Sequence, residues 1–168
     1  MSAKALFLDR DGVVNIEKNY LHKIEDFELV EGIVEVCRLY QERGYRVIVV
    51  TNQSGIARGM YSEEDFQLLS RWMTDHFAEL GITIDRIYHC PHHEEISGAC
   101  ECRKPEPGMF LEAQRDFGLD MGASVMIGDN ERDIEAAIRA GVGKNILLSW
   151  EADSSKADRI IRSLKELL

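Results

Sequence analysis

Short apolar runs, several of them ending at a polar residue, recur along the chain. The runs cover residues 5–8, 47–50, 125–127 and 146–148. An apolar run of this length predicts a strand that is buried on both faces of a sheet. The first run ends at Asp9, the second at Thr51, and the third at Gly128 followed by Asp129. The pattern therefore predicts buried strands whose carboxyl ends carry polar chemistry.

Segments with helical spacing of apolar residues alternate with these runs. They cover residues 30–43, 62–81, 107–118 and 131–140. Ser62 and Asp65 resemble a capping box that opens the second segment, and Gly81 ends it. Alternating strands and helices imply right-handed crossovers and a mostly parallel sheet with helices on both faces. We therefore predict a single α/β domain over residues 1–168.

The topology of such a sheet predicts where a ligand binds. In open parallel sheets the ligand crevice lies beyond the carboxyl ends of the strands. Asp9, Thr51 and Asp129 would all emerge there, although they come from three separate regions of the sequence. These residues are therefore expected to converge on one crevice.

Composition and charge narrow the classes of partner. The 168 residues are 45% hydrophobic and 30% charged, which is ordinary for a globular domain with one core. A formal net charge of -10 makes nucleic acid an improbable partner, because a protein that follows a phosphate backbone needs a basic face. No apolar run is long enough to span a bilayer, and no apolar leader precedes the first strand. We expect a cytoplasmic protein that binds neither nucleic acid nor membrane.

Two acidic motifs follow predicted strands. Asp9 and Asp11 precede Gly12, and two carboxylates at a strand end repel each other unless a cation such as Mg²⁺ lies between them. Asp129 could complete the magnesium shell, with Asp133 supporting a ligand or a lysine from below. The plainer alternatives are an Asp-Gly turn for the first motif and a helix cap for the second.

Candidate phosphate-binding groups lie outside the acidic motifs. The hydroxyl of Thr51 and the backbone amides after its strand could hold phosphate oxygens. Lys104 offers a compact point charge to a phosphoryl group, and Arg103 offers a planar fork. Each of these residues alone would be ordinary, so the constellation carries the prediction.

Three of the four cysteines cluster with two histidines. Cys90, Cys100 and Cys102 surround the pair His92-His93. In a reducing compartment this spacing predicts a tetrahedral Cys3His zinc site before it predicts disulfides, with either histidine as the fourth ligand. Four protein ligands leave no open position for water, so the zinc would be structural and would position the adjacent Arg103 and Lys104.

The ordered set of motifs resembles the haloacid dehalogenase superfamily over nearly the whole chain. This resemblance implies a Rossmann-like three-layer α/β/α sandwich and an aspartyl-phosphate intermediate. It assigns the following roles: Asp9 as nucleophile, Asp11 as general acid and base, Thr51 and Lys104 as stabilisers of the phosphoryl group, and Asp9, the Asp11 carbonyl and Asp129 as Mg²⁺ ligands. The motif spacing leaves room for a flap and a zinc-bound loop but for no large cap domain.

Within the superfamily, three segments resemble the D-glycero-D-manno-heptose 1,7-bisphosphate 7-phosphatases: residues 90–93, 102–105 and 51–59. The resemblance implies removal of the 7-phosphate from a sugar bisphosphate during synthesis of nucleotide-activated heptose for lipopolysaccharide. It further implies a monomer and His92 as the zinc ligand. The implied substrate-binding residues are Glu17, Lys18, Asn19, Tyr20, Asn52, Gln53, Ser54, Arg103 and Asn130.

Two other functions compete with this interpretation. Histidinol-phosphate phosphatases share the zinc loop, but there the run after the threonine typically continues with an acidic residue, which is absent here. A zinc-dependent interaction module with a degenerate active site is the alternative outside the enzymes. The intact acids argue against degeneracy, so we favour the sugar bisphosphate phosphatase.

Overall fold

Six parallel strands form the central sheet of the computed structural model, which describes residues 2–168. The strands lie in the order β3-β2-β1-β4-β5-β6. Their bounds are Lys4–Leu8 (β1), Tyr45–Asn52 (β2), Ile84–Cys90 (β3), Val125–Gly128 (β4), Lys144–Leu148 (β5) and Arg159–Ile161 (β6). The predicted parallel α/β fold is confirmed, and β3 and β6 extend the sheet beyond the four apolar runs.

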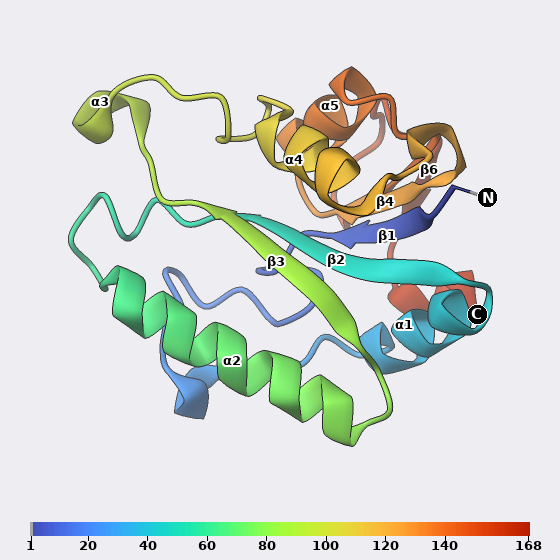
Figure 1. Ribbon diagram of the computed structural model, residues 1–168, viewed down its shortest axis with the longest axis horizontal. Coiled ribbons are helices and arrows are strands. Elements are labelled where there is room, and N and C mark those ends of the chain that lie inside the picture. Colours follow the sequence, from blue (N-terminus) through green and yellow to red (C-terminus); the bar gives the residue numbers. More distant parts are fainter. Residues whose placement is uncertain (1) are drawn as a thin grey trace.

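Helices cover both faces of the sheet. Figure 1 shows α4 and α5 on one face and α1 and α2 on the other, which completes the three layers. The α-helices are Ile33–Glu42 (α1), Glu63–Glu79 (α2), Glu94–Ser97 (α3), Gly108–Phe117 (α4) and Glu131–Arg139 (α5). The 3-10 helices are Ile24–Asp26 (η1), Met121–Ala123 (η2) and Leu164–Leu167 (η3). The predicted capping box of α2 is present, because the Ser62 side chain accepts from the Asp65 backbone and Asp65 accepts in return from Ser62.

The helix expected from residue 30 begins only at Ile33. The backbone N–H of Val30 donates to the Val14 carbonyl at 3.0 Å, so this residue pairs with the segment after β1 and not with a helix. Gly32 then takes a left-handed conformation (φ +92°) as the N-cap. The chain therefore turns at Gly32 before the helix starts.

Two hydrophobic clusters fill the space on either side of the sheet. Along β1, Leu6 and Leu8 pack with α1 and α2, whereas Ala5 and Phe7 pack with α4 and α5. Successive side chains of a strand point to opposite faces, so a strand buried on both faces must be apolar at every position. This burial explains why the central strands read as unbroken apolar runs.

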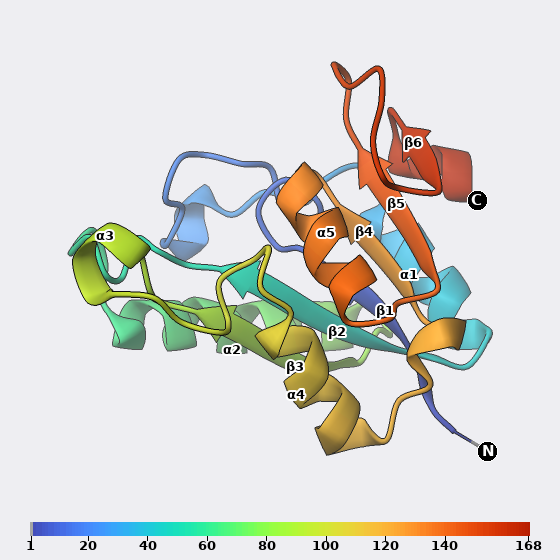
Figure 2. The same cartoon turned by 90° about the horizontal axis from the view of Figure 1, so that it is seen from above.

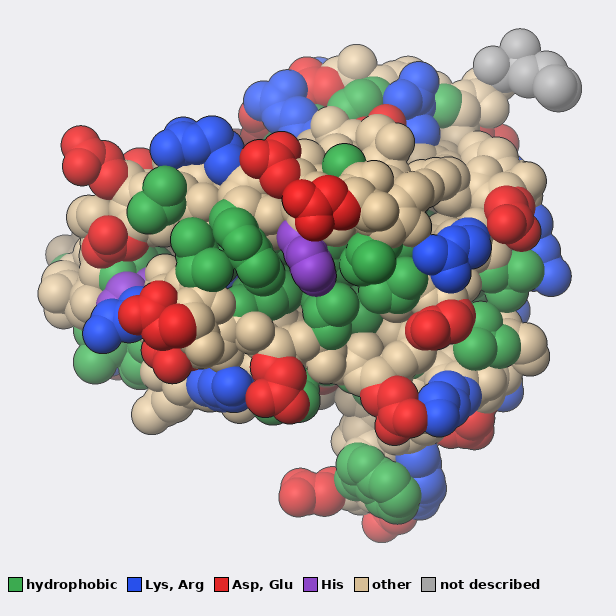
Figure 3. Space-filling model, turned by 90° about the horizontal axis from the view of Figure 1, so that it is seen from below, with side chains coloured by type: hydrophobic (Ala, Val, Ile, Leu, Met, Phe, Trp, Pro, Cys, Tyr) green, Lys and Arg blue, Asp and Glu red, His purple; other side chains and the backbone are tan. Residues whose placement is uncertain are grey.

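The face formed by α1 and α2 shows hydrophobic side chains among scattered charges of both signs (Figure 3). Phe27 and Trp72 belong to this partly buried layer, with ring centroids 5.3 Å apart. Among the described residues, no helix has the length and apolar character needed to cross a bilayer.

The segments that could line a site gather at one end of the sheet. Figure 2 shows the loop after β1, the end of β2 and the short α3 at the same end. Between β1 and α1 the only helical element is η1, so no cap domain is inserted there. The crevice is therefore bordered by loops and by the first turn of α5, with no cap domain inserted after β1.

Candidate active site

Asp9 lies where the chain order reverses in the sheet. It follows β1, which pairs with β2 on one side and β4 on the other, and its N–H donates to the Ile127 carbonyl at 3.2 Å. This register brings Asp9 beside Asp129, which follows β4. Gly12 permits the approach, because a Cβ at this position would lie 2.0 Å from Asp129 Oδ2. The first two acidic motifs thus converge as the topology predicts.

Lys104 is buried between two carboxylates. Its Nζ lies 2.9 Å from Asp9 Oδ1 and 2.6 Å from Asp133 Oδ1, and it donates to the Val50 carbonyl at 3.0 Å. Only 2% of this residue is exposed. Asp133 therefore contacts the lysine, one of the two partners predicted for it.

Asp133 also organises the backbone after β4. Its Oδ2 accepts from the N–H groups of Asp129 (3.2 Å) and Asn130 (3.1 Å), and Asn130 is the N-cap of α5. A Cβ at residue 128 would meet Asp133 Cβ at 2.4 Å, so Gly128 allows this contact. Helix capping and site support are thus performed by the same side chain.

The carboxylate cluster carries uncompensated negative charge. Oxygens of Asp9, Asp129 and Asp133 lie within 4.8 Å of one another, with Lys104 as the adjacent cation. Burial raises the pKa of Asp9 well above its usual range, and Asp133 adds to this shift. Burial, reinforced by Asp133, raises the pKa of Asp129 to about 6. Burial alone would lower the pKa of Lys104, but Asp133 and Asp9 raise it overall. The cluster thus has three carboxylates and only one ammonium group. Its carboxylate oxygens are ligands that suit a divalent cation.

Asp11 is held by donors on three sides. Arg10 donates to both carboxylate oxygens from Nη2 (3.0 and 3.2 Å), and Asn15 Nδ2 donates to Oδ1 at 2.9 Å. Gln53 Nε2 donates to Oδ2 at 3.1 Å. Sequence reasoning missed Arg10 and Asn15. Arg10 is only 1% exposed, and its position between two aspartates was the available signal.

The end of β2 supplies the next group of polar side chains. Thr51 is buried, and its Oγ1 accepts from Gln53 Nε2 at 2.9 Å. Asn52 Oδ1 accepts from the Lys104 backbone N–H at 3.0 Å, and Asn52 Nδ2 donates to the Lys104 carbonyl at 3.4 Å. Asn52 thereby ties the loop that carries Lys104 to the sheet.

Two cavities adjoin at this end of the sheet. One, of about 270 Å³, is lined by Asp9, Asp11, Lys104, Asp129 and neighbouring residues. The other, of about 310 Å³, shares part of that wall and is also lined by three arginines, Arg58, Arg103 and Arg132. The site therefore has an acidic compartment next to a basic one.

No ion pair joins any of these three arginines to a carboxylate within residues 2–168. Burial lowers the pKa of Arg103, and the like charges of Arg132 and Arg58 lower it further. Arg58 and Arg132 were missed from the sequence. Arg132 had a signal, since a basic residue in the first turn of a helix opposes the helix dipole.

Most of the expected substrate-binding residues line these two cavities. They are Glu17, Asn19, Tyr20, Asn52, Gln53, Ser54, Arg103 and Asn130. Lys18 is the exception: its Nζ lies 3.3 Å from Glu28 Oε1, and it lines neither cavity. The structure therefore gives Lys18 an ion-pair partner away from the crevice.

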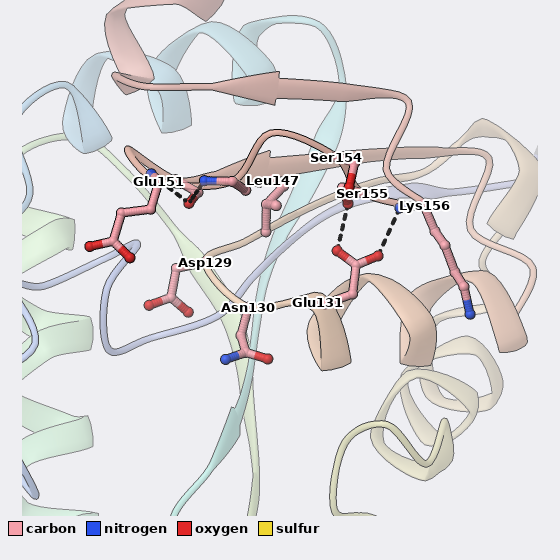
Figure 4. A pocket seen from close by; sticks show the side chains of 10 residues that line it. Asp129, Asn130, Glu131, Leu147, Glu151, Ser154, Ser155 and Lys156 are labelled. Atoms are coloured by element: carbon pink, nitrogen blue, oxygen red, sulfur yellow. Dashed lines mark hydrogen bonds between the residues drawn. The ribbon is translucent and has the colours of Figure 1, made fainter.

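A larger cavity of about 670 Å³ lies on the other side of Asp129 (Figure 4). Glu131 borders it and accepts from the Ser155 hydroxyl at 2.6 Å and the Lys156 N–H at 2.7 Å. Asp129 is the only member of the carboxylate cluster in its lining. The reactive groups face the smaller acidic cavity.

The cysteine cluster forms at the predicted place but in a different chemical state. Sulfurs of Cys90, Cys100 and Cys102 lie within 4.8 Å of one another, as a metal site requires. Cys90 and Cys102 are joined by a disulfide, whereas a zinc site needs both as thiolates. No histidine nitrogen in the described chain joins this group; His93 Nδ1 instead accepts from the Glu95 N–H at 3.2 Å. For His92 to bind zinc, the disulfide must therefore be reduced and the His92 imidazole must move toward the sulfurs.

Comparisons with known proteins agree with this geometry. A family model described as haloacid dehalogenase-like hydrolase matches residues 2–141. A D-glycero-alpha-D-manno-heptose-1,7-bisphosphate 7-phosphatase of Campylobacter jejuni is 51% identical, and the match covers 100% of this chain and 95% of that protein. A D-glycero-beta-D-manno-heptose-1,7-bisphosphate 7-phosphatase of Yersinia pestis is 44% identical, and the match covers 99% of this chain and 94% of that protein.

Solved structures share the fold. A HAD-like phosphatase from Mesorhizobium loti superposes with a TM-score of 0.90 at 34% identity, covering 99% of this chain and 83% of that one. The D,D-heptose 1,7-bisphosphate phosphatase of B. bronchiseptica, solved with magnesium and phosphate, gives a TM-score of 0.85 at 28% identity, with coverages of 98% and 95%. The similarity therefore spans nearly the whole chain.

Proposed function

Because this chain belongs to the haloacid dehalogenase-like hydrolases and is a phosphoric monoester hydrolase, we propose that it removes the 7-phosphate of D-glycero-D-manno-heptose 1,7-bisphosphate. The observation that carries the proposal is the pairing of two compartments. Asp9, Lys104 and Asp129 surround a space for the transferred phosphoryl group, and an adjoining cavity presents three arginines without acidic partners. A bisphosphate places one anionic group in each. The named relatives support the same substrate over nearly their full lengths.

In the first half of the reaction, Asp9 attacks the phosphorus atom. A carboxylate oxygen of Asp9 forms the new bond to phosphorus as the bond between phosphorus and the C7 oxygen breaks. Asp11, in its protonated form, gives its proton to the departing sugar oxygen. The products of this step are the heptose 1-phosphate and a phosphorylated Asp9.

In the second half, Asp11 acts in the opposite direction. Its carboxylate takes a proton from water as the water oxygen attacks phosphorus, and the bond between phosphorus and the Asp9 oxygen breaks. Inorganic phosphate leaves, and Asp9 and Asp11 return to their starting states. Lys104 and the Thr51 hydroxyl would stabilise the charge on the phosphoryl oxygens in both halves.

We assign the magnesium site to Asp9, the Asp11 carbonyl and Asp129. The clustered carboxylates support this assignment. Burial, and then the charge of Asp133, raise the pKa values of Asp9 and Asp129, and a bound cation would favour the ionised forms that burial disfavours. When bound, Mg²⁺ would neutralise charge on the transferring phosphoryl group. We do not include Asp133 among the magnesium ligands, because its carboxylate already forms an ion pair with Lys104.

We assign the second phosphate to Arg58, Arg103 and Arg132. Guanidinium groups bind phosphate through paired hydrogen bonds, and a dianion would relieve the repulsion that these groups exert on one another. Arg58 also lies over the Tyr20 ring, 6.0 Å from its centroid. This contact connects the pocket to the flap after β1, residues 12–23, which precedes η1. The C1 phosphate would thus be held away from the scissile bond.

Replacing these arginines should impair the bisphosphate more than a small ester. Arg58→Ala and Arg103→Ala are each expected to lower kcat/KM for heptose 1,7-bisphosphate by about 10- to 100-fold, the usual loss for a charge-assisted hydrogen bond. The loss for p-nitrophenyl phosphate should be much smaller, because this ester has no second phosphate. Arg115→Ala, an exposed change on α4, is the matched control. Equal proportional losses on both substrates would contradict the assignment.

We propose a structural zinc ion for the loop between β3 and α4, bound by Cys90, His92, Cys100 and Cys102. The gathering of three sulfurs around one point supports this site, and the loop leads directly into Arg103 and Lys104. Disulfides are not maintained in the cytoplasm, so zinc bound to the thiolates would hold this loop in shape there. The disulfide in the structure represents the oxidised alternative for the same cysteines.

Metal and thiol analysis decides between the two states. Protein purified without strong chelators is expected to hold about one zinc per chain, and all four cysteines should react as thiols after denaturation and zinc release. Mild chelation should remove only magnesium and stop catalysis, with magnesium alone restoring it. Zinc-free, active protein with two of its cysteines in a disulfide would overturn the zinc assignment.

A further inference from the structure

A chain of buried and partly buried hydrogen bonds leads from Tyr61 to Asp11, the proposed general acid and base. The Tyr61 hydroxyl donates to Gln53 Oε1. The other end of the same amide, Gln53 Nε2, donates to Asp11 Oδ2 at 3.1 Å and to Thr51 Oγ1 at 2.9 Å. Tyr61 is 8% exposed and Gln53 is 2% exposed. Each polar atom of this side-chain amide therefore has a partner inside the protein.

The orientation of the Gln53 amide matters because its two ends have opposite hydrogen-bonding roles. The NH2 end only donates and the oxygen only accepts. A rotation of the amide by half a turn would put its oxygen against the Asp11 carboxylate, where two acceptors repel each other. A donor on the opposite side, such as the Tyr61 hydroxyl, favours the observed orientation. Burial raises the pKa of Tyr61 to about 12, so this hydroxyl keeps its proton near neutral pH.

Neighbouring residues hold the Tyr61 ring at this position. The His22 ring stacks on it with centroids 5.1 Å apart and planes 13° from parallel. Gly55 leaves the space that the ring needs, because a Cβ at this position would lie 2.2 Å from Tyr61 Cε1. The Tyr61 ring is thus held between His22 of the flap after β1 and Gly55 of its own loop after β2. Tyr61 lies on a different segment from any of the catalytic acids.

We infer that Tyr61 is a positioning residue: it orients the Gln53 amide so that this amide presents its donor end to the Asp11 carboxylate. This role rests on the proposed function of Asp11 as general acid and base. Tyr61 needs no contact with the reacting atoms for this purpose. Loss of its hydroxyl would leave the Gln53 oxygen without its donor and loosen the amide, so the Asp11 carboxylate would lose one of its fixed donors.

Tyr61→Phe tests this relay of hydrogen bonds from Tyr61 through Gln53 to Asp11, because the substitution removes the hydroxyl and keeps the ring. With enzyme in excess, release of heptose 1-phosphate from heptose 1,7-bisphosphate should slow about tenfold, which is part of the usual contribution of a general acid. Release of p-nitrophenolate from p-nitrophenyl phosphate should stay within about twofold, because this leaving group departs without a proton. Adding Tyr61→Phe to Gln53→Leu should cause no further loss, since the relay is then already broken.

Tyr88→Phe is the matched control. Tyr88 is also a buried tyrosine with one hydroxyl hydrogen bond, to Asp116 Oδ2 at 2.6 Å, but it lines neither of the two cavities. This variant should keep the wild-type rates on both substrates, and thermal melting should show both variants folded.

Equal losses by Tyr61→Phe on the two substrates would overturn the relay, as would a further loss in the Gln53→Leu background. A wild-type enzyme that hydrolyses another alkyl phosphate but not the heptose bisphosphate would count against the proposed substrate alone. In that case the same comparison, made with that alkyl phosphate, still decides the role of Tyr61.

Discussion

The Asp9→Asn protein is expected to be folded but to have lost phosphatase activity by a factor on the order of 10³ or more, as is usual when an enzyme loses its nucleophile. The amide is neutral and cannot form the phosphorylated intermediate. The change is nearly isosteric, and Lys104 keeps its contact with Asp133 at 2.6 Å. Activity and stability should therefore separate in this variant.

The stability of the metal-free Asp9→Asn protein should equal or exceed that of the wild type at neutral pH. Burial and the neighbouring Asp133 raise the pKa of Asp9 in the folded state. Because the folded state then holds this proton more tightly than the unfolded chain does, ionisation of Asp9 with rising pH opposes folding. The neutral amide removes that cost. Chemical denaturation with magnesium chelated measures the difference.

Asp120→Asn is the matched control for this substitution. Asp120 caps η2 through a hydrogen bond from the Ala123 N–H at 3.3 Å, and asparagine caps a helix equally well. This control should keep both activity and stability. Ordinary steady-state turnover by homogeneous, folded Asp9→Asn protein would contradict the assignment of Asp9 as nucleophile.

Lys104→Met is expected to abolish activity and also to lower the free energy of unfolding. The lysine is 2% exposed and contacts both Asp9 and Asp133, so its removal leaves two buried carboxylates without their cation. Breaking a buried pair in this way costs about 3–5 kcal/mol. Urea denaturation of the metal-free protein and a phosphate-release assay measure the two effects.

A second substitution separates the two roles of this lysine. Lys104→Met combined with Asp133→Asn removes the charge that lost its partner, and should recover part of the stability without recovering activity. Lys165→Met, which breaks only an exposed pair with Glu31, should change neither property. A Lys104→Met protein as stable as the wild type would show that the buried ion pairs of Lys104 do not contribute to the free energy of unfolding.

Local sequence patterns predicted the strands that are buried on both faces, but not the others. β1, β2, β4 and β5 read as apolar runs because helices cover both sides of each. β3 lies at the sheet edge and mixes buried positions with partly buried and exposed ones, such as Asp85 and Arg86. β6 has only three residues at the opposite edge. Neither edge strand needs continuous hydrophobicity, so neither produces that signal.

The same distinction applies to the residues of the candidate site, some of which have a local sequence signal and some of which do not. Asp9, Thr51 and Asp129 were identified because each comes after a buried apolar run, and parallel strands bring their carboxyl ends together. Arg58 and Tyr61 lie in the loop after β2 with no comparable pattern. Their convergence on the crevice depends on how that loop folds against the flap. The chemistry of such residues becomes visible only from their hydrogen bonds and cavity positions.

The most direct test of the central claim is ³¹P NMR of heptose 1,7-bisphosphate incubated with the enzyme and Mg²⁺, with each anomer in turn. We expect the C7 phosphate resonance to disappear and inorganic phosphate to appear in equal amount, while the C1 phosphate remains as heptose 1-phosphate. Loss of the C1 phosphate, or no reaction with either anomer while histidinol phosphate is hydrolysed, would contradict the proposed function.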